Sequence, residues 1–103
     1  MLLEAVGWVR TRLSSADTRS KARGAREAAD RARDNGDWQK AGDLYRAYLR
    51  IYPNKPDLWI QLGNMCKESL QYAAAAKAYQ RAIRLRPSDA EPHVQMGHLR
   101  KRQ

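Results

Sequence analysis

Residues 56–89 have the sequence PDLWIQLGNMCKESLQYAAAAKAYQRAIRLRPSD, and residues 22–55 form a similar unit directly before them. Shifting the sequence by 34 residues aligns four identical pairs: Ala41 with Ala75, Tyr45 with Tyr79, Arg50 with Arg84, and Pro53 with Pro87. A unit of this size cannot bury its own apolar face, so neighbouring units must stack to share a core. The repeat therefore predicts an array of stacked units.

The local pattern within each unit is helical, with Gly and Pro largely confined to the ends of segments. Asn35-Gly36 predicts a helix stop, because both residues tolerate left-handed backbone geometry. Pro56 suits a first helical turn, where no N–H is needed, and Ser88 followed by Glu91 fits a capping box. The predicted helices span residues 2–14, 18–34, 38–52, 56–69, 72–86 and 90–102.

The second unit, with Trp-Ile-Gln-Leu-Gly at residues 59–63, resembles the signature of the tetratricopeptide repeat (TPR) family. The resemblance implies an all-α, right-handed superhelical solenoid of helix-turn-helix units. By position in the family pattern, residues of both units take packing roles: Trp59, Leu62, Gly63, Tyr72, Ala75, Tyr79, Ala82 and Pro87, with Trp38, Ala41, Tyr45, Tyr48 and Pro53.

The first unit departs from the family pattern in helix A, where Ala25, Ala28 and Ala29 replace Trp, Leu and Gly. Tyr48 in its second helix stands where the family usually has Ala. We expect these departures to compensate, because a helix faced with alanine leaves room that a large ring can fill.

The resemblance divides the chain into four segments: an N-terminal capping helix and loop (1–17), a divergent first TPR (18–55), a second TPR (56–89), and helix A of a third repeat or a C-terminal cap (90–103). An unfinished third repeat favours a fragment of a longer protein, and its apolar end would permit self-association. Residues 2–13 carry an apolar stripe at helical spacing that suits a cap. Weak contact of these residues with a membrane surface is the alternative.

Composition limits the function classes. The chain has 103 residues, one Cys, and 20 Lys+Arg against 11 Asp+Glu, for a net charge of +9. A single Cys excludes an intrachain disulfide and a thiolate metal cluster, which suits the cytoplasm. No apolar run approaches the roughly 18 residues that span a bilayer, and the first residues lack the basic region of a signal peptide.

No constellation for catalysis is present in the sequence. His93 and His98 are five residues apart, so they do not share a helix face. Neither is accompanied by a nucleophile with a base, a carboxylate pair or a glycine-rich phosphate loop. We therefore predict a chain with no enzymatic activity of its own and with no catalytic, cofactor-binding or metal-binding residues.

In the TPR family, helix A of each repeat lines a concave groove, and the resemblance implies that a protein or peptide binds there. The best-known basic clamp of the family, which grips a terminal carboxylate, is matched here only at Arg26. A groove of mixed charge instead suits a polar or amphipathic peptide. The candidates by position are Arg23, Arg26, Asp30, Arg33, Asp57, Ile60, Gln61, Asn64, Lys67, Gln95 and His98.

The surplus positive charge falls on the second helix of each unit, and we call its residues the basic strip: Lys77, Arg81, Arg84, Arg50 and Arg46. The strip is predicted on the convex side, where an anionic partner such as RNA, lipid headgroups or an acidic protein face could bind. Solubility is the simpler interpretation, because no aromatic residue is interleaved with these cations.

Two functions follow from these observations. The favoured one is a non-catalytic scaffold that mediates protein–protein interaction through its groove. The alternative is an accessory N-terminal segment of a larger bacterial enzyme such as a glycosyltransferase, because repeats of this family precede catalytic domains in some bacteria. Nucleic-acid binding through the basic strip is less favoured than either.

Overall fold

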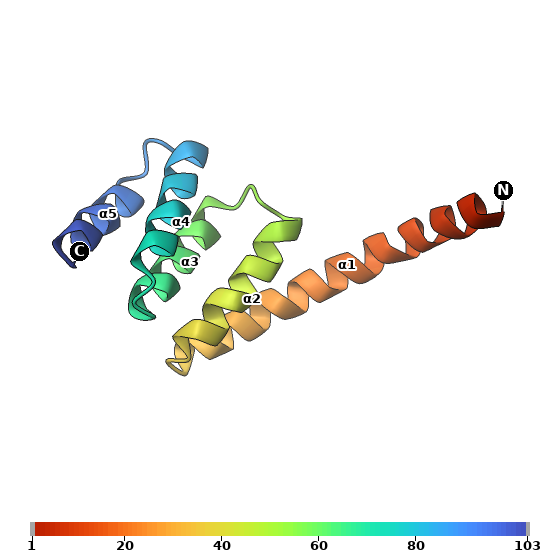
Figure 1. Cartoon of the computed structure of the whole chain (residues 1–103), viewed down its shortest axis with the longest axis horizontal. Coiled ribbons are helices and arrows are strands. Elements are labelled where there is room, and N and C mark those ends of the chain that lie inside the picture. The colour runs from red at the N-terminus through yellow and green to blue at the C-terminus, as the bar shows by residue number, and fades with distance from the viewer. Residues whose placement is uncertain (1, 103) are drawn as a thin grey trace.

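A computed structural model describes the backbone of residues 2–102 and the side chains of residues 16–102. The elements are α1 (Leu2–Asp34), α2 (Trp38–Ile51), α3 (Pro56–Glu68), α4 (Tyr72–Leu85) and α5 (Ala90–Arg102). Helices α1 and α2 form one antiparallel pair, α3 and α4 a second, and α5 packs beside α4 (Figure 1). The expected all-α solenoid is confirmed, and the described residues contain no strand.

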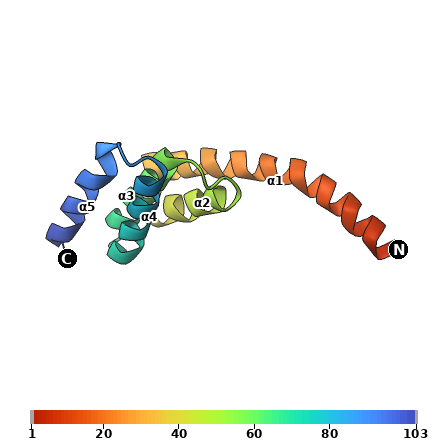
Figure 2. The ribbon, with the colours of Figure 1, turned by 90° about the horizontal axis from the view of Figure 1, so that it is seen from above.

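Helix α1 differs from the expectation, because the loop predicted between residues 14 and 18 does not exist. No Gly or Pro interrupts the backbone ladder between residues 14 and 18, so the helix continues through them. Asp17 also pairs with Lys21 at 3.1 Å, one helical turn later, which supports a continuous helix. Figures 1 and 2 show α1 continuing beyond the end of α2. The capping role expected of residues 1–17 depends mostly on side chains outside the described residues, and the membrane contact expected of residues 2–13 depends on them entirely.

The core runs through both helix pairs and is centred on two tyrosines. Tyr45 and Tyr79 are each 0 % exposed, and Ala41 and Ala75 beside them are equally buried. A Cβ atom on Gly63 would lie 2.6 Å from Cδ1 of Tyr79, so only glycine lets this ring approach α3. All five of these residues are buried.

The alanine-rich part of α1 accommodates a large ring, as expected. Ala29 and Ala32 are buried on α1, and Tyr48 of α2 is buried with them. The guanidinium of Arg26 lies 5.9 Å from the centre of the Tyr48 ring, in a cation–π contact between α1 and α2. Tyr48 therefore occupies the space that the small side chains of α1 leave free.

The two prolines expected to pack are instead exposed, and they contribute through their backbone. The indole Nε1 of Trp59 donates to the carbonyl oxygen of Pro53 at 2.7 Å. Nε2 of His93 lies 3.4 Å from the carbonyl oxygen of Pro87, at the equivalent place in the next repeat. Both contacts fasten the start of a helix to the loop before it, so Pro53 and Pro87 are loop residues rather than core residues.

The turns inside the two repeats have the same backbone geometry. Gly36 has a φ of 76°, and Leu70 in the equivalent position has a φ of 63°. The Asn35-Gly36 stop is therefore confirmed, and Pro56 begins α3 as expected. The predicted Ser88–Glu91 capping box is wrong, because the backbone N–H of Glu91 donates to Oδ1 of Asp89 at 3.0 Å. Asp89 directly precedes α5 and fills the capping position.

Candidate functional site

The predicted groove residues on α1 are held in place by a buried tyrosine. The Tyr45 hydroxyl donates to Oδ1 of Asp30 at 2.6 Å and accepts from Nη1 of Arg33 at 3.2 Å. Burial first, and then the hydrogen bond to Asp30, raise the pKa of Tyr45. Arg33 also pairs with Asp34 at 3.1 Å. Asp30 and Arg33 thus form part of the link between α1 and α2.

The second repeat contains the same link in a neutral form. The Tyr79 hydroxyl donates to Oδ1 of Asn64 at 2.6 Å, so Asn64 occupies the place that Asp30 has in the first repeat. Burial raises the pKa of Tyr79 and keeps its hydroxyl protonated as a donor. The sequence assigned Asp30 and Asn64 to ligand binding and did not show this structural bond, although the 34-residue shift aligns Asp30 with Asn64 and Tyr45 with Tyr79.

Other predicted groove residues connect neighbouring elements. Nζ of Lys67 donates to Oε1 of Gln95 at 2.8 Å and joins α3 to α5. Asp57 at the start of α3 pairs with Arg86 after α4 at 3.1 Å. The first contact brings Lys67 and Gln95 together where α3 and α5 meet, and both side chains are partly exposed there.

The remaining groove candidates divide by burial. Ile60 is only 6 % exposed and belongs to the core, so its assignment to the groove is wrong. Ile60 belongs to the same buried cluster as Leu62, because an apolar side chain is most stable out of water. Arg23, Arg26 and His98 are exposed and Gln61 is partly exposed, so all four remain accessible to a ligand.

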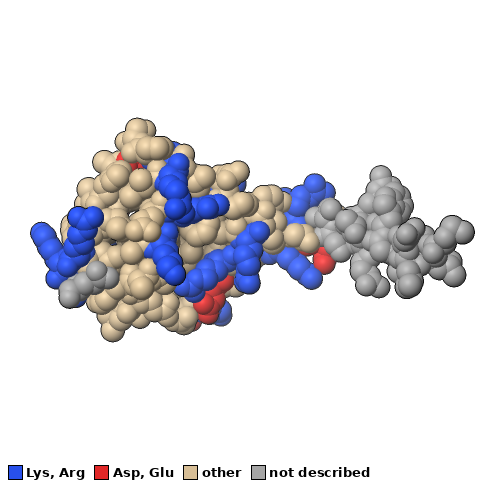
Figure 3. Space-filling model, turned by 45° about the horizontal axis from the view of Figure 1, so that its top comes forward, with Lys and Arg blue, Asp and Glu red and all other residues tan. Residues whose placement is uncertain are grey.

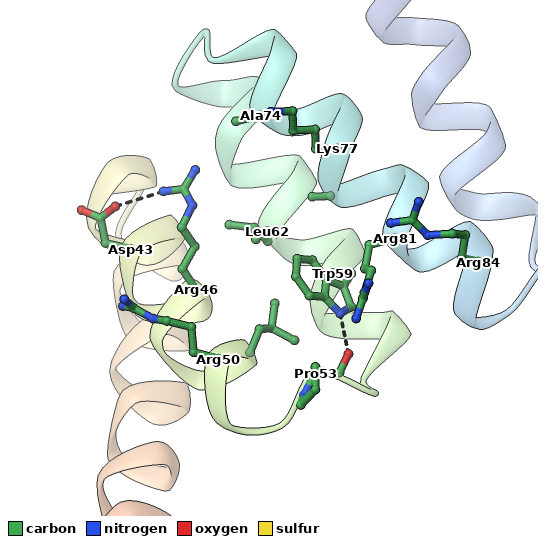
Figure 4. A pocket seen from close by; sticks show the side chains of 12 residues that line it. Asp43, Arg46, Arg50, Pro53, Trp59, Leu62, Ala74, Lys77, Arg81 and Arg84 are labelled. Atoms are coloured by element: carbon green, nitrogen blue, oxygen red, sulfur yellow. Dashed lines mark hydrogen bonds and ion pairs between the residues drawn. The ribbon is translucent and has the colours of Figure 1, made fainter.

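The basic strip is gathered around a hollow of about 720 Å³ between α2 and α4, which we call the basic hollow (Figure 4). Its volume falls in the range of about 300–1,000 Å³ that is typical of ligand sites. Figure 3 shows that Lys and Arg outnumber acidic side chains across one face of the stacked helices. The basic hollow is lined by Asp43, Arg46, Leu49, Arg50, Pro53, Trp59, Leu62, Ala74, Lys77, Ala78, Arg81 and Arg84.

Trp59 supplies the aromatic residue that the sequence did not place near these cations. Its ring comes from α3, and the guanidinium of Arg81 on α4 lies 5.7 Å from the ring centre. The bond from its indole to Pro53 fixes the ring. The pattern along α4 could not show this contact, because the two residues come from different helices.

The described residues contain neither a metal-binding cluster nor a membrane-spanning helix. No group of three or more His, Cys, Asp or Glu side chains is placed to hold a metal ion. None of the described helices has both the length and the apolar composition needed to cross a membrane.

Comparison with known families decides what kind of repeat this is. The family described as "Tetratricopeptide repeat" matches residues 22–65, and the family described as "TPR repeat" matches residues 63–103. Together they cover residues 22–103, which contain the C-terminal part of α1 and all of α2, α3, α4 and α5. The chain belongs to the tetratricopeptide repeat family. TPR repeats are non-catalytic modules that generally mediate protein–protein interaction, and this chain carries that type of module.

Curated relatives share the TPR segment within much longer proteins. The chain is 32% identical over 59 residues to the yeast (Saccharomyces cerevisiae) "Anaphase-promoting complex subunit CDC27", which covers 57% of this chain and 8% of that protein. It is 37% identical over 57 residues to the human "Protein O-mannosyl-transferase TMTC2", which covers 55% of this chain and 7% of that protein. The TPR chain thus spans less than a tenth of each relative.

Proposed function

We propose that this TPR chain binds a peptide segment or a partner domain along the face formed by α1, α3 and α5. The observation that carries the proposal is the orientation of Asn64. Its amide oxygen is fixed by the Tyr79 hydroxyl at 2.6 Å, while the side chain is partly exposed. The amide N–H groups of Asn64 are therefore oriented before any ligand arrives, as donors for the backbone carbonyl of an extended peptide.

Neighbouring polar groups support the same face. Gln95 accepts a 2.8 Å hydrogen bond from Lys67. Gln61 on α3 and His98 on α5 are accessible on the same two helices. Arg23 and Arg26 extend the accessible set onto α1. This surface combines oriented side-chain amides with a few basic side chains. Such a surface suits a polar or amphipathic peptide segment better than a strongly charged one.

The test uses Asn64→Asp, which keeps an acceptor for Tyr79 and removes the two N–H donors. Asp30 already performs this acceptor role for Tyr45, so the fold tolerates a carboxylate here. Peptides selected from a random display library on the unmodified chain serve as ligands, with affinity measured by fluorescence anisotropy. We expect Asn64→Asp to weaken binding by about tenfold, since a peptide carbonyl would lose its donor.

Arg50→Gln with Lys77→Gln is the matched control, because both residues are exposed and line the basic hollow rather than the groove. Peptides whose affinity depends on Asn64 should bind this variant as tightly as they bind the unmodified chain. Selected peptides that bind Asn64→Asp as tightly as the unmodified chain would remove Asn64 from the binding face.

An accessory role within a larger enzyme is the second candidate. The observation in its favour is that two curated relatives, from human and mouse, are named as O-mannosyl-transferases. Translation of the coding sequence downstream of Gln103 tests this role, with a transferase domain as the expected result and an immediate stop codon as the contrary one. The bacterial setting expected from the sequence has no support among these relatives.

We propose a reducing compartment such as the cytoplasm, which suits the buried, free thiol of Cys66. Self-association through the repeat ends is tested by light scattering across a concentration series, where a constant monomer mass would contradict it.

A further inference from the structure

The basic hollow combines an apolar floor with basic walls. Leu49, Leu62 and Ala78 are buried residues that line its floor. Arg46 and Arg50 approach it from α2, and three further cations approach from α4 (Figure 4). A ligand with both an apolar group and negative charge therefore matches the lining in both respects.

The charge of the lining is not balanced within the described part of the chain. Asp43 is the one acidic residue of the lining, and it already pairs with Arg46 at 3.2 Å. Arg46 also donates to Sγ of Cys66 at 3.2 Å, which uses a second part of its guanidinium. No carboxylate of the described residues lies within 4.0 Å of the other four cations of the basic strip: Arg50, Lys77, Arg81 and Arg84.

Arg81 gives the clearest sign of a missing acceptor. Its Nε atom is buried and has no hydrogen-bond partner among the described residues. A buried donor without an acceptor is unfavourable, and native structures contain few of them. The guanidinium cannot turn away freely, because it lies over the Trp59 ring. The Nε atom itself is closed to a ligand, but the Arg81 side chain lines the basic hollow and forms no ion pair with a described residue, so an anionic group there would pair with its guanidinium.

The geometry favours a peptide over other polyanions. A nucleic acid would stack its bases on an exposed aromatic face, but the Trp59 ring lies beneath Arg81. A flat membrane surface would not reach the buried floor of Leu49 and Leu62, whereas an apolar side chain of a peptide would.

We propose that the basic hollow binds an acidic peptide segment of a partner protein. Carboxylates of the segment pair with Arg81 and Arg84 on one side and with Arg50 on the other. An apolar side chain between them packs on the floor. This site is separate from the groove proposed above, so each can fail without the other.

The experiment measures the anisotropy of a fluorescein-labelled peptide in which Asp and Glu flank a central Leu. The comparison peptide carries Asn and Gln in place of Asp and Glu. We expect the acidic peptide to bind, to weaken with added salt, and to lose affinity by about tenfold or more in Arg81→Gln with Arg84→Gln. The comparison peptide should not bind measurably.

Arg31→Gln with Arg100→Gln is the matched control, because it removes the same charge at exposed positions outside the hollow. It should leave affinity within about twofold of the unmodified chain. Arg50→Gln with Lys77→Gln provides a second hollow variant at exposed positions, should Arg81→Gln disturb folding in a circular dichroism melt.

Several outcomes would overturn the proposal. One is equal binding of the neutral peptide, and another is an equal loss of affinity in the Arg31 and Arg100 control. A third is that single-stranded RNA or phosphatidylserine vesicles, but not the acidic peptide, bind in a manner that requires Arg81 and Arg84. The groove variant Asn64→Asp should have no effect in this assay.

Discussion

The hydroxyl of Tyr79 donates a 2.6 Å hydrogen bond to Oδ1 of Asn64, across the two helices of one repeat. The same bond, of the same length, joins Tyr45 to Asp30 one repeat earlier. Each tyrosine ring is fully buried, while its hydroxyl reaches a partly exposed polar side chain on the first helix. A single side chain in each repeat therefore connects the core to the proposed binding face.

This bond leads to a prediction on stability. We expect Asn64→Ala to lower the free energy of unfolding by about 1–3 kcal/mol, because the buried Tyr79 hydroxyl would lose its acceptor. Asn64→Asp retains the acceptor and should remain within about 1 kcal/mol of the unmodified chain. Urea denaturation followed by circular dichroism measures both. Equal losses in the two variants would show that the bond adds nothing to stability.

Two glycines of equivalent position should respond in opposite ways to alanine. A Cβ at Gly63 would meet the Tyr79 ring, so Gly63→Ala should cost about 1–3 kcal/mol through displacement of that ring. A Cβ at Gly97 has no neighbouring atom within 4 Å, so Gly97→Ala should gain up to about 1 kcal/mol from helix propensity. Urea denaturation of both variants decides the matter. An unchanged free energy of unfolding in Gly63→Ala would contradict the close packing of the Tyr79 ring against α3.

The left-handed backbone geometry at Leu70 lowers the stability of the fold, and a substitution at this turn can raise it. Leu70 has a left-handed φ of 63° and is 71% exposed, while Gly36 occupies the equivalent place in the first repeat. Left-handed geometry costs a residue with a side chain roughly 1–2 kcal/mol. We expect Leu70→Gly to raise the free energy of unfolding by about 1 kcal/mol.

Leu70→Ala is the control for that substitution, since it removes the exposed side chain and keeps a Cβ. It should show no comparable gain in a thermal melt. A gain from alanine equal to that from glycine would mean that the exposed leucine, and not the backbone geometry, is responsible.

The raised tyrosine pKa values predict an alkaline loss of stability. In the folded chain the pKa values of Tyr45 and Tyr79 lie above their ordinary value of 10.0, chiefly because of burial. The folded protein therefore keeps two protons that the unfolded chain releases. This contribution is complete below pH 10 and is lost as the pH rises from there through the folded pKa values. The loss reaches at most about 1.4 kcal/mol per pH unit for each tyrosine.

Urea denaturation at several pH values checks this dependence with Tyr79→Phe as the reference. The variant lacks one of the titrating groups, so the stability difference from the unmodified chain should shrink above pH 10.0. A difference that stays constant with pH would mean that Tyr79 ionises equally in the folded and unfolded chains.

Much of the fold was predictable, because helix boundaries in the repeats depend on local signals. Asn35-Gly36 and Pro56 specify backbone geometry directly, and the structure follows them. The start of the first repeat was not predictable in the same way. Ser14 and Ser15 are compatible with either a helix cap or a helix interior, and the surrounding chain decides between them.

The candidate sites were less predictable, since they depend on contacts between helices. The sequence correctly placed charges of α2 and α4 together as the basic strip, because Arg50 and Arg84 are repeat equivalents. It could not show that Trp59 of α3 lies under Arg81. It also assigned Ile60 to the groove from its position, although burial on α3 depends on how the neighbouring helices cross.

The basic hollow lies across the boundary between the two repeats, with walls from α2 of the first and α4 of the second. Within each repeat the tyrosine bond ties the helix pair together, whereas the two walls of the hollow belong to different repeats. An occupant that pairs with cations on both walls would hold α2 and α4 in a fixed relative position across this boundary. Its arrival would set the curvature of the solenoid, and with it the shape that the opposite face presents to a second ligand.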